Sequence, residues 1–147
     1  MFKSVLIVCT GNICRSPMAE GLLRARLDAL KLKVKVASAG VAAMKGWPAD
    51  PLAIAVMQEH EIDISGHVAQ QVTAPLLSAS DLILTLDQTH TAWMNRQFPQ
   101  FRGRVHKILK WHDNRDVEDP YCHPKSAFKH SYKDIDLGIK DWLKRLE

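Results

Sequence analysis

Residues 9–16, with the sequence C-T-G-N-I-C-R-S, constrain the fold of this chain more than any other stretch. An apolar run, residues 5–8, comes just before them, and Pro17 comes just after. Proline suits the first position of a helix because its missing N–H would have no partner there. The order therefore predicts a buried strand over residues 4–9, a tight loop, and a helix over residues 17–31.

The loop between this strand and this helix has the features of an anion site. Backbone N–H groups and the helix dipole favour a negative charge at a helix N-terminus, which Ser16 is predicted to cap. Gly11 and Asn12 suit a tight loop because both tolerate left-handed backbone angles. Arg15 could grip a phosphate through two parallel hydrogen bonds, with Cys9 beneath it. The same groups would stabilise a thiolate, so the loop would place a nucleophile in an anion hole.

The longer sequence V-C-T-G-N-I-C-R-S-P-M-A-E resembles the signature of the low-molecular-weight protein tyrosine phosphatases, and its T-G-N form is similar to that of bacterial members. The resemblance implies that Cys9 is the nucleophile and that Arg15 binds the phosphate. It also implies that Asn12 holds the loop backbone and that Ser16 assists the departure of the thiolate. The substrate-binding residues expected on this basis are Thr10, Gly11, Asn12, Ile13, Cys14, Ser16, Trp47 and Tyr121.

The sequence Asp119-Pro120-Tyr121 is the second stretch expected to carry chemistry. By itself it is only a turn signal. Attack by a thiolate expels an oxyanion that needs a proton, and a carboxylic acid can supply that proton and later activate water. In this position the sequence resembles the general-acid loop of the family, which makes Asp119 the general acid and base and puts Tyr121 at the pocket entrance. Cys122 and His123 follow, where several relatives have a second tyrosine.

Four further residues are candidates for the same site. Ser38 and His67 match family residues that support the phosphate loop, although such residues are otherwise most often polar surface. Trp47 lies in a loop, residues 41–49, that forms one wall of the cleft in the family; it could stack on a substrate ring or merely cover the core. Asp87 follows a strand at the place where ligands collect in open α/β sheets, and it could equally cap the next helix.

The rest of the chain alternates apolar strands with amphipathic helices. The predicted strands are residues 4–9, 33–38, 81–86 and 104–109, and the predicted helices are residues 17–31, 50–60, 73–79, 89–98 and 125–146. This order favours parallel pairing with right-handed crossovers. The predicted fold class is α/β: a four-stranded parallel twisted sheet in the order 2-1-3-4, with helices on both faces and the phosphate loop after strand 1.

Composition limits the remaining possibilities. The 147 residues predict a single domain, residues 1–147, and 46% hydrophobic with 24% charged residues is ordinary for a globular protein. Residues 1–8 are too short for a signal peptide, and no apolar run is long enough to cross a membrane, so no membrane insertion is expected. Three cysteines, an odd number, argue against a disulfide framework and for the reducing cytoplasm.

Together these features predict hydrolysis of protein phosphotyrosine through a phosphocysteine intermediate, with no metal and no cofactor. The expected partner is a phosphotyrosine-bearing protein, and the resemblance to bacterial members implies an autophosphorylated tyrosine kinase of exopolysaccharide export. Cys14, five residues after Cys9, is predicted to trap an oxidised Cys9 as a reversible disulfide.

Three other functions compete with this prediction. An arsenate reductase of the same fold needs two further cysteines around the end of the third strand, and residues 80–95 contain none. A phosphoprotein-binding module without activity is disfavoured because Cys9, Arg15 and Asp119 are all present. A nucleic-acid partner would suit the net charge of +4 and the basic and aromatic residues between 102 and 111. These residues flank a strand without any nucleic-acid-binding motif, so we expect no nucleic-acid partner.

Overall fold

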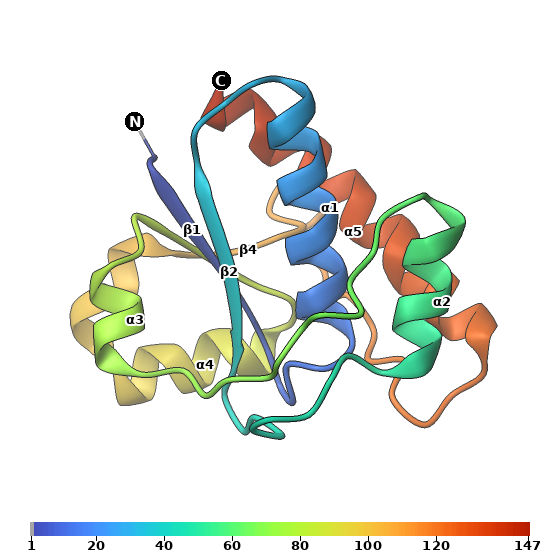
Figure 1. Cartoon of the computed structure of the whole chain (residues 1–147). Coiled ribbons are helices and arrows are strands. Elements are labelled where there is room, and N and C mark those ends of the chain that lie inside the picture. The colour runs from blue at the N-terminus through green and yellow to red at the C-terminus, as the bar shows by residue number, and fades with distance from the viewer. Residues whose placement is uncertain (1) are drawn as a thin grey trace.

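The computed structural model, which describes residues 2–147, contains a four-stranded parallel sheet in the order β2-β1-β3-β4 (Figure 1). Its strands are β1 (Ser4–Cys9), β2 (Lys35–Gly40), β3 (Leu82–Thr85) and β4 (Val105–Lys107). β1 pairs with β2 along its whole length, so Cys9 lies beside Gly40 at the carboxyl end of the sheet. The predicted fold class and strand order are confirmed.

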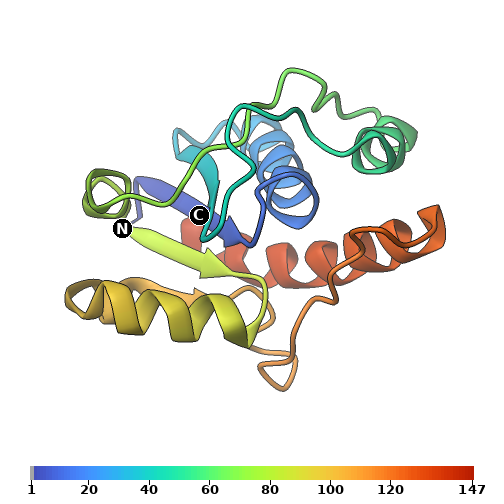
Figure 2. The ribbon, with the colours of Figure 1, turned by 90° about the horizontal axis from the view of Figure 1, so that it is seen from below.

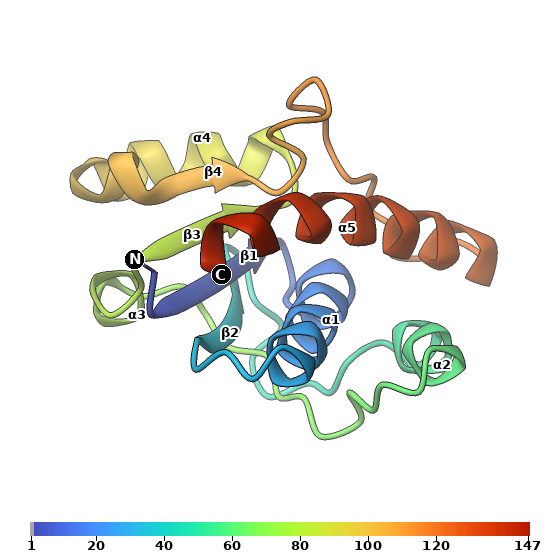
Figure 3. The same ribbon diagram turned by 90° about the horizontal axis from the view of Figure 1, so that it is seen from above.

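Helices cover both faces of this sheet (Figure 3). They are α1 (Arg15–Ala29), α2 (Pro51–Glu59), α3 (Ala74–Ser78), α4 (Gln88–Gln97) and α5 (Lys125–Leu146), and a short 3-10 helix, η1 (Pro99–Arg104), follows α4. α1, α2 and α5 pack together on one face, whereas α4 packs on β3 and β4 on the other. Among the described residues, no helix combines the length and the apolar character that a membrane crossing requires.

The central strand β1 contributes side chains to a core on each face. Val5 and Ile7 belong to the core shared with α1 and α5, and Leu6 and Val8 belong to the core shared with α3 and α4. All four are at most 2% exposed. A strand buried on both faces reads as a continuous apolar run, which is why this stretch shows no alternation of polar and apolar residues. Both layers therefore fix the carboxyl end of β1, where Cys9 lies.

The start of α1 differs from the prediction. The helix begins at Arg15 instead of Pro17, and its N-cap is Cys14 instead of Ser16. Ser16 does not cap the helix because its hydroxyl is engaged by Cys9 and by a neighbouring amide. Arg15 and Ser16 consequently belong to the first helical turn, which fixes the direction of both side chains.

Three strands differ in extent from the prediction. β3 is one residue shorter at each end, Leu82–Thr85 instead of residues 81–86. β2 starts at Lys35 rather than at residue 33, because a left-handed turn at Lys31 (φ 57°) follows α1 and the chain reaches β1 only at Lys35. β4 covers only half of the predicted residues 104–109, because η1 extends to Arg104 and a turn follows the strand. β2 also extends to Gly40, two residues past its predicted end, and Gly40 is the residue that pairs with Cys9.

Candidate active site

The loop after β1 closes around the start of α1 at the carboxyl end of the sheet (Figure 2). Asn12 adopts the left-handed conformation that its side chain tolerates (φ 60°), whereas Gly11 is outside the left-handed region. Gly40 of β2 is the glycine on which the loop depends, because a Cβ there would lie 2.4 Å from the carbonyl oxygen of Thr10. The loop therefore rests directly on the backbone of β2.

A chain of hydrogen bonds runs behind the loop from Cys9 to Glu20. The Oγ of Ser16 lies 2.8 Å from the Sγ of Cys9 and accepts a hydrogen bond from Nδ2 of Asn12 at 2.7 Å. The same amide donates to Oγ of Ser38 at 2.9 Å, and Ser38 donates to Glu20 at 2.6 Å. Asn12, Ser16 and Ser38 are at most 2% exposed, so water does not compete for these bonds.

The segment around His67 and Gln70 holds Asn12 from the other side. Nε2 of His67 lies 2.7 Å from the carbonyl oxygen of Asn12, and His67 must donate because a carbonyl can only accept. The N–H of Gln70 donates to Oδ1 of Asn12 at 2.9 Å. These contacts fix which way the Asn12 amide points, so that its nitrogen faces Ser16 and Ser38.

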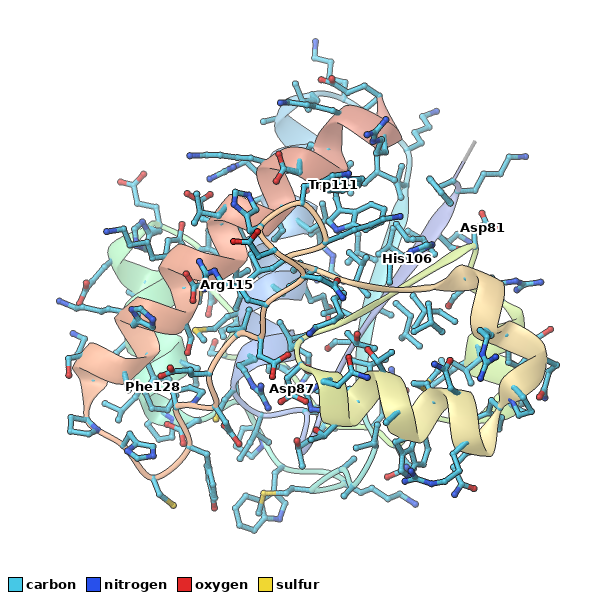
Figure 4. All side chains as sticks on the ribbon, turned by 180° about the vertical axis from the view of Figure 1, so that it is seen from behind. Asp81, Asp87, His106, Trp111, Arg115 and Phe128 are labelled. Carbon is cyan, nitrogen blue, oxygen red and sulfur yellow. The ribbon has the colours of Figure 1, made fainter. Side chains whose placement is uncertain are left out.

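The guanidinium of Arg15 is buried and held by two oxygen atoms. Its Nη1 donates to Oδ2 of Asp87 at 2.8 Å and to the backbone oxygen of Val117 at 2.7 Å. Asp87 is the N-cap of α4, as one of the two predictions for this residue had it, and the same carboxylate holds Arg15 without lining the pocket (Figure 4). Burial disfavours the charge of Asp87, but hydrogen bonds from Thr89 and Arg15 outweigh burial and lower its pKa to about 2. Asp87 is therefore a carboxylate at neutral pH and balances the charge of Arg15.

A small pocket of about 140 Å³ brings the loop, Arg15 and Asp119 together. Its lining residues are Cys9, Thr10, Gly11, Ile13, Cys14, Arg15, Ala42, Met44, Asp119 and Tyr121. Cys9 is 2% exposed, whereas Tyr121 is 42% exposed. Nη2 of Arg15 lies 3.7 Å from Oδ2 of Asp119. A thiol, a cation and a carboxyl group thus face one cavity.

Three residues expected to bind substrate do not line this pocket. The side chains of Asn12 and Ser16 lie behind the loop, where Asn12 bonds Ser16 and Ser16 contacts Cys9. Trp47 is 52% exposed and is not among the residues that line the pocket. The loop of residues 41–49 does contribute to the wall of the pocket, but through Ala42 and Met44, which the sequence does not single out, and not through Trp47.

A larger hollow of about 600 Å³ lies outside the pocket, between α1, β2 and residues 61–70. It touches the back of the site through Ser38 and His67, but no cysteine lines it. Among residues 2–147, no three His, Cys, Asp or Glu side chains gather in a way that could hold a metal ion. The smaller pocket, which contains Cys9, is the candidate active site.

Comparison with known proteins agrees with this geometry. A sequence model of the family described as low molecular weight phosphotyrosine protein phosphatase matches residues 4–147. The chain belongs to this phosphatase family. The resemblance seen in the sequence is confirmed.

The similarity to individual relatives covers almost the whole chain of this phosphatase. The chain is 42% identical over 146 residues to the probable low molecular weight protein-tyrosine-phosphatase EpsP of Ralstonia nicotianae, and the match covers 99% of this chain and 97% of the relative. The tyrosine phosphatase Wzb of Escherichia coli K30, solved with sulphate, is 35% identical and superposes with a TM-score of 0.93 over 100% of both chains. The YwlE arginine phosphatase is 30% identical, with a TM-score of 0.92 over 97% of this chain and 95% of the other.

The loop that carries Asp119 in this phosphatase is tied down where it leaves the sheet. The N–H of Val117 donates to the carbonyl oxygen of Leu86 at 2.8 Å. Arg115 forms two hydrogen bonds of 2.9 Å with the buried carboxylate of Asp134, which joins the loop to α5 (Figure 4). Asp119 is therefore presented to the pocket by backbone that is fixed on its N-terminal side.

The three cysteines of the phosphatase are free. Cys9 and Cys14 are buried and line the same pocket, whereas Cys122 is exposed beside Tyr121. Burial raises the pKa of the Cys14 thiol, and the charges of Asp50 and Cys9 add to this effect. Cys14 is therefore a neutral thiol beside the candidate nucleophile.

His90 is a site residue of the phosphatase that the sequence analysis missed. Its side chain is fully buried in the first turn of α4, with Nε2 2.9 Å from Oγ1 of Thr10 and Nδ1 3.2 Å from the backbone nitrogen of Asp87. Asp87 and His90 have the spacing of a capping box, but Glu or Gln is the usual residue at the His90 position. The sequence signal for His90 is therefore weak.

Proposed function

We propose that this phosphatase hydrolyses phosphotyrosine in proteins through a phosphocysteine intermediate. Cys9 is the nucleophile, Arg15 binds the phosphoryl group, and Asp119 is the general acid and base. The observation that carries the proposal is that these three side chains line one small pocket, with Cys9 at a helix N-terminus and Arg15 buried beside it. Loop N–H groups, the helix dipole and Arg15 all favour the dianionic phosphoryl group there.

The reaction has two steps. In the first, the Cys9 thiolate attacks phosphorus, the P–S bond forms, and the P–O bond to tyrosine breaks while Asp119 gives its proton to the leaving oxygen. In the second, water attacks phosphorus and gives a proton to the Asp119 carboxylate. The P–S bond then breaks, releasing inorganic phosphate and the Cys9 thiolate. Ser16, 2.8 Å from the sulfur, stabilises that thiolate each time it is free.

The walls of the pocket support an aryl phosphate as substrate. Ile13, Ala42 and Met44 are apolar, and Tyr121 lies at the exposed rim. An aromatic ring fills such a channel, whereas phosphoserine is too short to reach Cys9 from the rim. A phosphoarginine guanidinium would instead need several hydrogen-bond acceptors. Asp119 is the only carboxylate among the described side chains that line the pocket, so the pocket suits an aromatic ring better than a guanidinium.

The proposal extends to partner and location. The natural substrate is a phosphotyrosine-bearing protein, and the similarity to bacterial members points to an autophosphorylated tyrosine kinase of exopolysaccharide production. A cytoplasmic location is supported by the three free thiols, which persist in a reducing compartment. Residues 1–147 act as one domain, with neither metal nor cofactor in the reaction.

The test is a comparison of sequence-matched phosphotyrosine, phosphoserine and phosphoarginine peptides, with arsenate plus a thiol donor as a further arm. Phosphotyrosine should react about 100-fold or more faster than the other peptides, because only it fits the channel. EDTA should leave the rate unchanged. Equal rates on phosphotyrosine and phosphoserine, or faster reaction with phosphoarginine, would overturn the substrate assignment.

Cys9→Ser tests whether Cys9 is the nucleophile. It should lose turnover but still bind inorganic phosphate, because the anion site remains while the alcohol is a weak nucleophile. Residual activity within about tenfold of the natural enzyme would refute covalent catalysis by Cys9.

A further inference from the structure

The imidazole of His90 links the phosphate loop to Asp87, the residue that holds Arg15. Through Nε2 it bonds the hydroxyl of Thr10, the residue after Cys9, and through Nδ1 it bonds the backbone N–H of Asp87. The carboxylate of Asp87 in turn holds Arg15 at 2.8 Å. One buried ring thus connects the phosphate loop, through Thr10, to the guanidinium of Arg15, through Asp87.

The direction of both hydrogen bonds follows from the partners of the ring. The N–H of Asp87 can only donate, so Nδ1 accepts and the proton of the neutral ring is on Nε2. Burial lowers the pKa of His90 to about 4, and the charges around it pull in opposite directions: Asp87, Asp119 and Asp116 raise the value and Arg15 lowers it. The ring is therefore neutral at neutral pH and donates to Oγ1 of Thr10.

Thr10 is consequently held from two directions. Its carbonyl oxygen accepts from the N–H of Ala42 at 3.0 Å, and its hydroxyl accepts from His90 at 2.9 Å. The first contact comes from the segment after β2 and the second from α4. Because the backbone of Thr10 belongs to the loop that wraps the phosphate, both contacts set how the loop N–H groups point into the pocket.

We propose that His90 is a positioning residue for phosphoryl transfer, which keeps the phosphate loop and Arg15 at the spacing that a phosphoryl group requires. The inference rests on the proposed function only in assuming that the pocket binds a phosphoryl group. Small displacements of a binding group are costly in a preorganised site, so loss of this link should weaken both phosphate binding and turnover.

Two single variants remove the link from opposite ends. His90→Asn keeps an acceptor near the Asp87 N–H but is too short to reach Thr10, and Thr10→Val removes the hydroxyl at nearly constant volume. Each should lower kcat/KM for p-nitrophenyl phosphate by about tenfold and raise the inhibition constant of inorganic phosphate by a similar factor. Thr10→Ser, which restores a hydroxyl, should recover most of the loss seen with Thr10→Val.

The double variant and a control on the same helix separate positioning from general destabilisation. His90→Asn with Thr10→Val should be no worse than the poorer single variant, because both remove the same contact. Thr91→Val, on α4, removes a hydrogen bond of 2.6 Å to Thr85 of β3. This contact does not involve the loop, so the variant should lower the Tm without changing phosphate inhibition. Independent, multiplying losses in the double variant would overturn the proposal, as would phosphate inhibition within about twofold of the natural enzyme in both single variants.

Nitrogen-15 NMR of the histidine rings gives an independent reading. His90 should be the Nε2–H tautomer at neutral pH. The Nδ1–H tautomer would break the bond from the Asp87 N–H and make Nε2 the acceptor from Thr10, which would overturn the proposal. If His90→Asn does not fold, the tautomer of His90 and the phosphate inhibition of Thr10→Val still test the proposal. If the enzyme proves inactive on phosphotyrosine while the variants still change its inhibition by phosphate, that result would uphold the positioning role of His90 and refute only the proposed substrate.

Discussion

The Oγ of Ser16 lies 2.8 Å from the Sγ of Cys9, and Asn12 donates to the same Oγ at 2.7 Å. Because the amide nitrogen can only donate, the hydroxyl hydrogen of Ser16 is left to point at the sulfur. The hydroxyl is thus oriented as a donor to Cys9 before any substrate arrives. In the proposed mechanism it stabilises the thiolate both as attacking group and as leaving group.

Ser16→Ala should therefore impair the step in which the thiolate leaves. A hydrogen bond to a charged group contributes more than a neutral one, so breakdown of the phosphocysteine should slow by about 10- to 100-fold. Alkylation of Cys9 by iodoacetamide at neutral pH should also slow. Burst kinetics with p-nitrophenyl phosphate would measure the first effect, with Ser80→Ala, remote from the pocket, as control. An unchanged breakdown rate would mean that another group stabilises the departing sulfur.

Asp119→Asn should slow turnover in a way that depends on the leaving group. General acid help is worth roughly 10² to 10⁴ in rate, and it matters most for a poor leaving group such as tyrosine, with a phenol pKa of about 10. An acidic phenol leaves unaided, so its phosphorylation step should change little. The measurement is the first-step rate across a series of aryl phosphates. A loss of equal size throughout would assign Asp119 to positioning and make His123, close by on the same loop, the next candidate acid.

Cys14→Ser should make oxidation of the enzyme harder to reverse. Peroxide converts the Cys9 thiolate to a sulfenic acid, and the neutral Cys14 thiol in the same pocket can condense with it to a disulfide and water. The natural enzyme should regain most of its activity with dithiothreitol after a peroxide pulse, and the variant much less. Cys122→Ser removes the exposed thiol and serves as control. Full recovery in the Cys14 variant would leave Cys14 with a packing role alone.

Gly40→Ala and Gly138→Ala form a matched pair that separates activity from stability. A Cβ would lie 2.4 Å from the carbonyl oxygen of Thr10 in the first and 2.6 Å from that of Ile108 in the second. Both variants should lose about 1 to 3 kcal/mol of unfolding free energy through overpacking. Only Gly40→Ala should weaken phosphate inhibition, because only Thr10 belongs to the pocket. If both variants bind phosphate equally well, the loop is not seated on β2 as described.

Acid should destabilise the fold through His90. Its pKa is lowered by burial to about 4 in the folded protein and rises to its ordinary value of about 6.5 on unfolding. Between these values the unfolded chain binds more protons, so the contribution is complete above about pH 6.5 and is lost as the pH falls towards 4, by about 3 kcal/mol. Urea unfolding of the natural protein and His90→Asn across this range would isolate the effect. A parallel pH dependence in the two proteins would contradict it.

Local signals made much of the fold predictable. Asp50 and Thr73 were expected to begin helices, and each side chain accepts the hydrogen bond of an N-cap, from Leu52 and Leu76. The strand before Cys9 was predictable because burial on both faces leaves only apolar residues in β1. Each of these signals lies within a few residues of the structure it specifies.

The contacts that arrange the site could not be predicted in the same way. The partner of Arg15 at Val117 is a backbone carbonyl, a group that every residue carries, so no side chain identifies it. His90 meets Thr10 across 80 residues of sequence, and that meeting depends on how α4 packs on the sheet. Met44 and Trp47 are only three residues apart, and the turn between them decides which reaches the pocket.

The hydrogen bond from Arg15 to Val117 also bears on how the enzyme is made, because it closes a loop of 102 residues. During synthesis the segment with the nucleophile leaves the ribosome early, whereas the carbonyl that steadies its arginine follows much later. Contacts between such distant segments form late, since the entropy of closing the loop must be overcome first. A nascent chain that stops before residue 117 has the complete signature of residues 9–16 and no means of holding Arg15 in place. Phosphatase activity therefore has to wait until residue 117 has been synthesised and has reached Arg15.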